Sequence, residues 1–145
     1  MTGWLLDTNI LSAFAPGKPA IGPIIAEWFN ERSDKLFLSA VTAAEIEAGI
    51  SKLRRTGSGR RADQLREWFE RILSFYADRV LSFDLAAARI AGVLSDAALA
   101  DGRHPGFADV AIAAIAKSRE LVILTLNLRH FGPLGVDTLN PFNAV

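Results

Sequence analysis

Short apolar segments alternate along the chain with stretches of helical spacing, and this alternation limits the folds that the sequence can adopt. The apolar segments cover 4–6, 36–38, 80–81, 121–124 and 136–139, and helical spacing covers 24–30, 42–53, 63–76, 84–100 and 107–116. Short strands that alternate with helices form a parallel sheet with helices on both faces. We therefore expect an α/β fold, a three-layer α/β/α sandwich with a mainly parallel sheet of four to five short strands.

Composition favours one soluble domain. The chain has 145 residues, of which 50% are hydrophobic, and this length suits a single domain over 1–145. The absence of cysteine excludes disulfides, thiolate metal sites and thiol nucleophiles, and it favours a cytoplasmic protein. Because no run of about 18 uncharged apolar residues occurs, we expect no contact with a membrane.

The charge balance leaves room only for local contact with a polyanion. Sixteen basic residues offset sixteen acidic ones. One stretch is locally basic, because no acid occurs between Glu47 and Asp63, and it contains Lys52, Arg54, Arg55, Arg60 and Arg61. These cations either form a solvated helix end and a loop near Gly57 and Gly59, or they contact phosphates.

Asp109 is the only charged residue between Pro105 and Ala116. A helix that is apolar on all sides is expected to be buried, and a buried carboxylate needs a partner, which a cation could provide. The alternative is that Asp109 caps amides in the first turn of its helix.

Asp7 and Glu45 follow two predicted strands. Asp7 stands at the carboxyl end of the first strand, where parallel sheets bind ligands, although the segment Asp7-Thr8-Asn9 would also suit a helix N-cap. Glu45 completes a Thr42-x-x-Glu45 capping box, which predicts a helix that opens at Thr42. At about 100° per residue, Glu45 and Glu47 point about 200° apart, so only one can face a site, and we choose Glu45 for its nearness to the strand.

Three carboxylates at neighbouring strand and helix ends are expected to converge. They would repel one another unless a hard divalent cation were bound. We therefore expect Asp7, Glu45 and Asp109 to hold Mg²⁺ or Mn²⁺.

The chain resembles the PIN-domain family, and most closely its VapC-type branch of toxin ribonucleases. The resemblance covers nearly the whole chain in the family's order. Its matching segments are LLDTNIL (5–11), LSAVTAAEIEAG (38–49), DVAIAA (109–114), TLN (125–127) and LNPF (139–142).

This resemblance implies a Mg²⁺- or Mn²⁺-dependent endoribonuclease that is the toxin of a type II toxin–antitoxin pair. Its substrate would be RNA, and a cognate small antitoxin protein would inhibit it. The resemblance assigns Asp7, Glu45 and Asp109 to the metal site and catalysis, with Asn9 and Thr125 in support. An aromatic stripe near Trp28, Phe29 and Ile50, together with the family likeness, predicts a homodimer and an inhibitor-binding face.

The sequence departs from the family where many relatives carry a fourth acid. Asn127 stands there and is expected to support the site without adding charge. We expect His130 to be a loop residue and His104 a surface residue.

Two other functions stay open. One is a catalytically degenerate member of the fold that acts as a binding module or scaffold. The other is a Mg²⁺-dependent aspartyl phosphotransfer protein of the phosphatase or receiver type. The phosphatase type needs a second aspartate, which Asp7-Thr8-Asn9 lacks. The receiver type needs a lysine at the end of a late strand, whereas Lys117 falls on a predicted helix.

Overall fold

Five parallel strands form the centre of the molecule. The computed structural model describes residues 2–143. The strands are β1 (Trp4–Leu6), β2 (Leu36–Ser39), β3 (Val80–Leu81), β4 (Val122–Leu124) and β5 (Thr138–Leu139), and they form one sheet in the order β3-β2-β1-β4-β5. Each neighbouring pair is parallel. The predicted α/β class and parallel sheet are confirmed.

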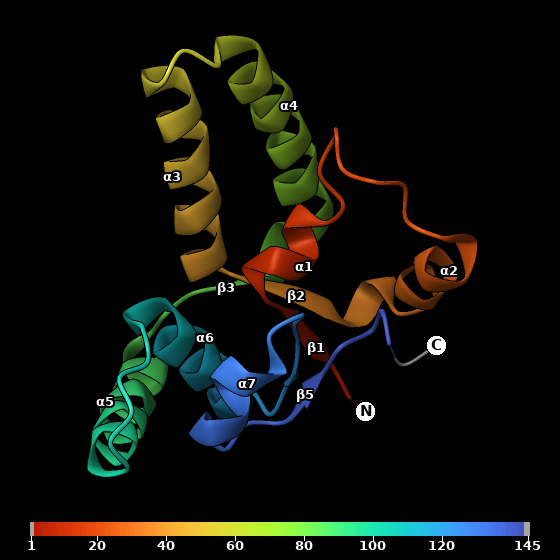
Figure 1. The fold of residues 1–145 in the computed structure, drawn as a ribbon. Coiled ribbons are helices and arrows are strands. Elements are labelled where there is room, and N and C mark those ends of the chain that lie inside the picture. Colours follow the sequence, from red (N-terminus) through yellow and green to blue (C-terminus); the bar gives the residue numbers. More distant parts are fainter. Residues whose placement is uncertain (1, 144–145) are drawn as a thin grey trace.

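Helices cover both faces of this sheet (Figure 1). They are α1 (Thr8–Ser12), α2 (Pro23–Glu31), α3 (Ala40–Arg55), α4 (Gly59–Tyr76), α5 (Leu85–Ala100), α6 (Phe107–Ser118) and α7 (Leu128–Phe131). Short 3-10 turns span Ser33–Lys35, Ala77–Arg79 and Gly132–Leu134. The pair α3 and α4 forms a hairpin that extends away from the sheet (Figure 1).

Alternate residues of the central strands point into two separate cores. Leu5 and Ile123 pack with α5 and α6 on one face, whereas Leu6 and Leu124 pack with α1 to α4 on the other. This alternation follows from the two-residue period of a strand. The α6 segment from Val110 to Ala116 is entirely buried, as its apolar composition predicts.

The aromatic stripe belongs mainly to the second core. Phe29 and Ile50 are 7% and 2% exposed, and Trp28 packs edge-on against Trp4 under the guanidinium of Arg32. Phe29 and Ile50 therefore belong largely to the core, and the inhibitor-binding face near them stays a prediction.

Two helix starts also differ from the prediction. Helix α3 begins at Ala40, and Ser39 is its N-cap, since the Ser39 hydroxyl accepts a hydrogen bond from the Thr42 amide at 3.0 Å. The capping box at Thr42 is therefore wrong. Helix α4 begins at Gly59 rather than at the predicted position 63, so only three residues separate it from α3. Gly57 takes a positive φ of 90° in that turn.

Within residues 2–143, none of the helices combines the length and the hydropathy needed to cross a membrane.

Candidate active site

The carboxyl ends of β1, β2 and β4 meet at one edge of the sheet, and a cavity of about 830 Å³ opens there. Asp7 follows β1, Glu45 comes from α3, and Asp109 comes from the first turn of α6. All three predicted acids line this cavity, and Asn9 and Asn127 line it with them. The structure thus brings together residues that lie up to 120 positions apart in the chain.

Asp7 is buried and held at both carboxylate oxygens. It is 7% exposed; Oδ1 accepts a hydrogen bond from the Thr8 amide at 2.8 Å, and Oδ2 accepts one from the Thr125 hydroxyl at 2.9 Å. Burial raises the pKa of Asp7, the two hydrogen bonds oppose that rise, and the charges of Asp109 and Glu45 add to it. Asp7 is also the N-cap of α1, so the capping interpretation is confirmed, and the same side chain lines the cavity.

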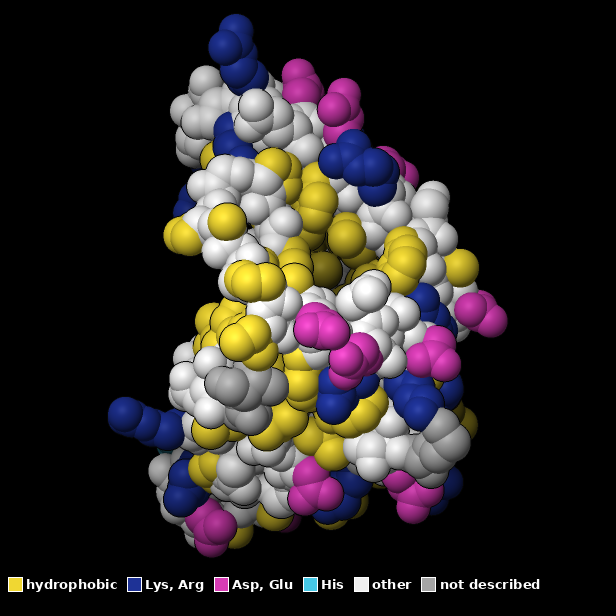
Figure 2. Space-filling model, turned by 90° about the vertical axis from the view of Figure 1, so that its right-hand side faces the viewer, with side chains coloured by type: hydrophobic (Ala, Val, Ile, Leu, Met, Phe, Trp, Pro, Cys, Tyr) yellow, Lys and Arg dark blue, Asp and Glu magenta, His cyan; other side chains and the backbone are white. Residues whose placement is uncertain are grey.

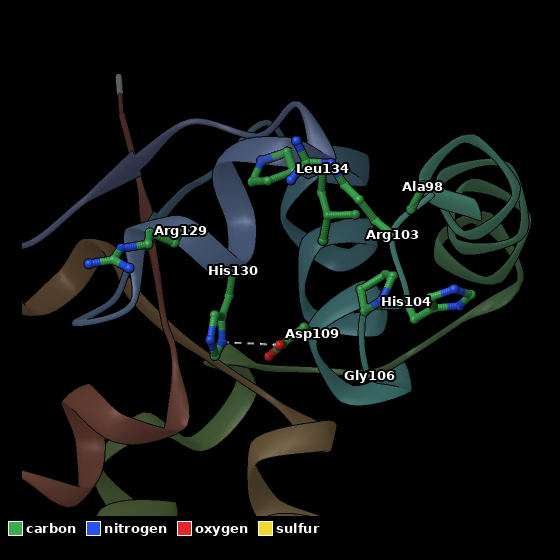
Figure 3. Close-up of a pocket in the computed structure, with 10 residues that line it drawn as sticks. Ala98, Arg103, His104, Gly106, Asp109, Arg129, His130 and Leu134 are labelled. Carbon is green, nitrogen blue, oxygen red and sulfur yellow. Dashed lines mark ion pairs between the residues drawn. The ribbon is translucent and has the colours of Figure 1, made fainter. Parts of the chain in front are cut away.

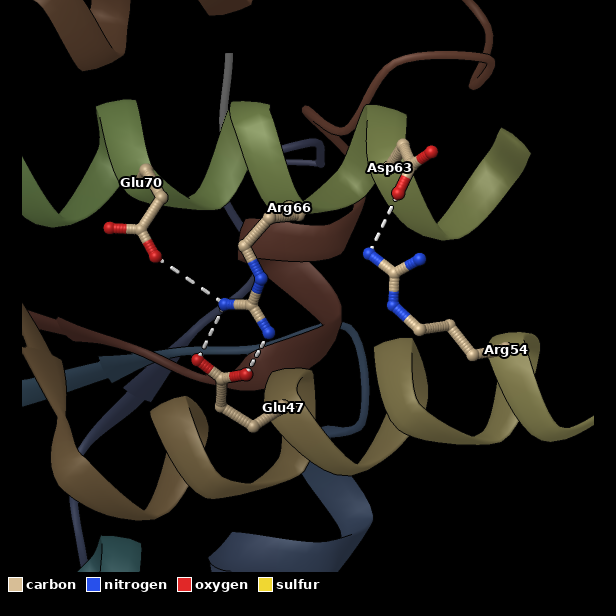
Figure 4. A network of polar contacts seen from close by, with 5 residues as sticks. All are labelled: Glu47, Arg54, Asp63, Arg66 and Glu70. Carbon is tan, nitrogen blue, oxygen red and sulfur yellow. Dashed lines mark hydrogen bonds and ion pairs between the residues drawn. The ribbon is translucent and has the colours of Figure 1, made fainter. Parts of the chain in front are cut away.

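Glu45 and Glu47 have separate partners, as their angular separation on the helix predicts. The Thr8 hydroxyl donates to Glu45 Oε1 at 2.5 Å. Glu47 faces α4 instead, where Arg66 binds both of its oxygens and lowers its pKa (Figure 4). Glu45 lies in the second turn of α3 rather than the first, because the helix starts at Ala40.

Asp109 is the more open of the two aspartates. Its side chain is 30% exposed, and His130 Nδ1 lies 3.4 Å from its Oδ2 (Figure 3). His130 lies in α7 and points toward Asp109, so the expectation of a loop histidine is wrong: three residues after β4 the chain turns back into a short helix that contacts α6. His104 is exposed, as predicted, and points away from Asp109 in the same view.

The supporting residues join β4 to the site. Asn9 Oδ1 accepts a hydrogen bond from the Leu126 amide at 3.3 Å, which ties α1 to the segment after β4. Thr125 is fully buried, and its hydroxyl accepts from the Asn127 amide at 2.9 Å while it donates to Asp7. The Asn127 side chain is exposed at the rim of the cavity.

Sequence reasoning missed four polar residues around the acids. Thr8, Ser39 and Thr42 form hydrogen bonds that lead to Glu45, and His130 contacts Asp109. Ser39 and Thr42 are fully buried, and their place directly after a predicted strand was the signal that could have identified them.

Most of the basic stretch lies apart from this cavity, but Arg61 lines a further cavity of about 330 Å³ that shares Thr8, Lys18 and Glu45 with it. Lys52, Arg54 and Arg55 end α3 and Arg60 and Arg61 begin α4, at the far end of the hairpin (Figure 1). Two of these cations are engaged: Arg54 pairs with Asp63 at 2.7 Å, and Arg61 donates to the Pro16 carbonyl.

A second group of basic residues lies beside the acids. Arg103, His104, Arg129 and His130 line a smaller cavity of about 350 Å³ that shares Asp109 with the larger one. Its other lining residues include Pro105 and Leu134, and the second of these is labelled in Figure 3.

The donor set at the cavity suits a hard divalent cation. Its candidate ligands are carboxylate and amide oxygens, which Mg²⁺ and Mn²⁺ prefer. Burial, and to a smaller extent the charges of Asp109 and Glu45, raise the pKa of Asp7, and a cation in the cavity would favour the ionised form instead. Within residues 2–143, no three acidic, histidine or cysteine side chains form a group that could hold a metal ion between them. The three acids share one cavity without forming such a group.

Comparison with known proteins gives relatives along nearly the whole chain. The plasmid stability protein StbB of Pseudomonas syringae pv. tomato is 34% identical over 97% of this chain and 99% of its own length. Toxin FitB of Neisseria gonorrhoeae is 32% identical over 96% and 98%, and the VapC ribonuclease Y4jK of Sinorhizobium fredii is 31% identical over 95% and 96%.

A solved structure and a family model agree with these relatives. The crystal structure of FitAcB from Neisseria gonorrhoeae superposes with a TM-score of 0.83 at 32% identity and covers 97% of this chain and 99% of that one. The PIN domain model matches residues 4–131, a range that contains all three acids of the cavity. The chain therefore belongs to the PIN domain family.

Proposed function

We propose that this protein is an endoribonuclease and the toxin of a toxin–antitoxin pair, and that its whole length forms one nuclease domain. The observation that carries the proposal is the cavity at the carboxyl edge of the sheet, where Asp7, Glu45 and Asp109 converge in a PIN fold. Relatives named as a toxin and as a ribonuclease, which align over nearly the whole chain, support it.

The chemistry is hydrolysis of an RNA phosphodiester assisted by Mg²⁺ or Mn²⁺. When bound, such a cation orients a water, lowers its pKa and stabilises charge on the scissile phosphate. The Thr125 hydroxyl and the Thr8 amide hold Asp7 in a fixed orientation. The Thr8 hydroxyl holds Glu45, and Asn127 lies at the rim without adding charge.

Two groups of cations could contact the phosphates of the RNA strand. The hairpin group contains Lys52, Arg54, Arg55, Arg60 and Arg61 and is the one that sequence analysis selects. The cavity group contains Arg103 and Arg129, and His104 lines the same cavity. We favour the cavity group for phosphates next to the scissile bond, because it lines a hollow that shares Asp109 with the candidate site. The hairpin group would contact phosphates farther from the scissile bond, and more weakly.

The antitoxin partner has an apolar surface available to it. Hydrophobic side chains gather around a hollow on the face that carries α2 (Figure 2). Beside α2 lies an apolar cavity of about 250 Å³, lined among others by Phe14, Phe29, Phe75 and Tyr76. The toxin name of one relative supports a protein inhibitor at such a surface. For the homodimer, the support is the exposed Leu85 and Val93 on α5.

The test is cleavage of a single-stranded RNA by the purified chain, free of any partner, with Mn²⁺, with Mg²⁺ or with a chelator. We expect cleavage only with metal. Asp7→Asn, Glu45→Gln and Asp109→Asn should each slow it about a thousandfold, since each removes ligand charge that supports several kcal/mol of transition-state stabilisation.

Matched controls separate the site from general loss of charge. Glu47 lies two residues from Glu45 but binds Arg66, and Asp96 lies on the exposed side of α5. The variants Glu47→Gln and Asp96→Asn should therefore cleave RNA at near the wild-type rate. A folded wild-type protein that neither cleaves RNA nor is stabilised by Mn²⁺ would instead be a degenerate binding module.

A further inference from the structure

We propose that a directed chain of hydrogen bonds, which starts at the N-terminus of α3 and passes through Ser39, Thr42 and Thr8, positions Glu45 for metal binding. Thr8 is the positioning residue that makes the last contact. The inference rests on the proposed function, because it concerns how one of the three acids is presented to the cation.

The chain is continuous from a backbone amide to a carboxylate. The Thr42 amide donates to the Ser39 hydroxyl at 3.0 Å, and the Ser39 hydroxyl lies 3.3 Å from the Thr42 hydroxyl. The Thr42 hydroxyl lies 2.9 Å from the Thr8 hydroxyl, which lies 2.5 Å from Glu45 Oε1. Ser39 and Thr42 are fully buried, so bulk water does not compete for the contacts between them, whereas the last contact, from Thr8 to Glu45, is exposed.

Counting hydrogens gives the chain one direction. An ionised Glu45 can only accept hydrogen bonds, so Thr8 must donate its single hydroxyl hydrogen to Glu45. The Thr8 oxygen then accepts from Thr42, and the Thr42 oxygen accepts from Ser39. The Ser39 oxygen accepts from the Thr42 amide, which cannot reverse its role. Every hydrogen therefore points toward the carboxylate, and aligned bonds of this kind strengthen one another.

Glu45 needs such support more than Asp7 does. Its side chain is long and exposed, and without a fixed contact it would sample many rotamers over the cavity. The Thr8 contact holds Oε1 and leaves Oε2 for a ligand. Asp7 is held by a shorter chain of the same design, in which the Asn127 amide donates to Thr125 and Thr125 donates to Asp7. Asp7 is thus held through one hydroxyl and Glu45 through three, and each chain of hydrogen bonds starts at a backbone amide.

The test is Mn²⁺ affinity by calorimetric titration of the full chain. Thr8→Val keeps the shape of the side chain and removes the hydroxyl, and it should weaken binding about 10 to 100-fold, the usual cost of losing a group that orients a ligand. Thr8→Ser restores the hydroxyl and should recover most of the affinity. Thr56→Val removes a hydroxyl that bonds only to backbone carbonyls of α3, and it should bind Mn²⁺ as wild type does.

A double-mutant cycle tests whether Thr8 acts through Glu45. In a Glu45→Gln background, Thr8→Val should weaken Mn²⁺ binding less than threefold, because the group that it positions is already altered. Equal affinity of Thr8→Val and wild type, or an equal loss in both backgrounds, would overturn the inference. If Thr8→Val fails to fold, Thr42→Val breaks the chain one bond earlier and should give a smaller loss of the same kind. Failure of wild type to bind Mn²⁺ at all would overturn the proposed function instead.

Discussion

The two sides of the cavity are built differently. On the β1 side, Asp7 is 7% exposed, and both of its carboxylate oxygens accept hydrogen bonds. On the α6 side, the Asp109 side chain is 30% exposed and faces His130, whose own side chain is 57% exposed, across 3.4 Å. We call these the closed side and the open side.

This difference separates preorganisation from access. A buried carboxylate with fixed donors keeps its orientation before any ligand arrives, and such preorganisation is what a catalytic site requires. A partly exposed carboxylate at the rim of the cavity can admit a substrate as large as an RNA strand. The closed side therefore sets the geometry, and the open side admits the ligand.

Matched substitutions on the two sides should separate their roles in stability. Thr125→Val removes the hydroxyl donor of a buried carboxylate and should destabilise the fold by about 1.5 to 3 kcal/mol. His130→Gln acts on an exposed contact and should change stability by less than about 0.5 kcal/mol. Chemical denaturation of both variants at neutral pH, without metal, makes the comparison. Equal losses would mean that the two sides do not differ in rigidity.

The raised pKa of Asp7 predicts that the stability of the fold depends on pH. Above its ordinary value of 3.8, the folded metal-free protein holds the Asp7 proton more tightly than the unfolded chain does. The contribution of Asp7 to stability therefore falls as pH rises from 3.8 through the raised pKa. Asp7→Asn removes this dependence, so its stability relative to wild type should increase between pH 3.5 and pH 7.

Denaturation curves at several pH values, with a chelator present, would measure this difference. A constant difference between Asp7→Asn and wild type across this range would mean that burial does not disfavour the charged form of Asp7.

The smallest expected effect concerns the cations next to the open side. Arg103→Gln with Arg129→Gln should lower the salt dependence of RNA binding by about 1.4 in log-log slope, the value for two contacts to single-stranded phosphates. The control pair Arg55→Gln with Arg60→Gln removes the same charge at the hairpin. RNA binding is measured by fluorescence anisotropy, and all variants carry Asp7→Asn so that the RNA is not cleaved. A larger loss from the hairpin pair would assign the phosphate contacts to the hairpin group.

Much of the fold followed from local patterns. The spacing of apolar residues located all five strands and the long helices, because periods of 2 and 3.6 residues are properties of short segments. The start of α3 was misplaced, because Ser39 and Thr42 both carry hydroxyls and only the course of the backbone shows which one caps the helix. His130 was misjudged for a similar reason, since nothing near it in sequence shows that α7 turns toward α6.

The sequence by itself determined the fold class and the meeting of Asp7, Glu45 and Asp109, because the carboxyl ends of parallel strands must share one edge of the sheet. Only the tertiary structure decided which side chains hold those acids. Thr8 contacts Glu45 across 37 positions, and Thr125 contacts Asp7 across 118. A hydrogen bond depends on distances of about 3 Å and on direction. Such placement comes from the packing of α1 against α3 and of β4 beside β1, which no local pattern in the chain encodes.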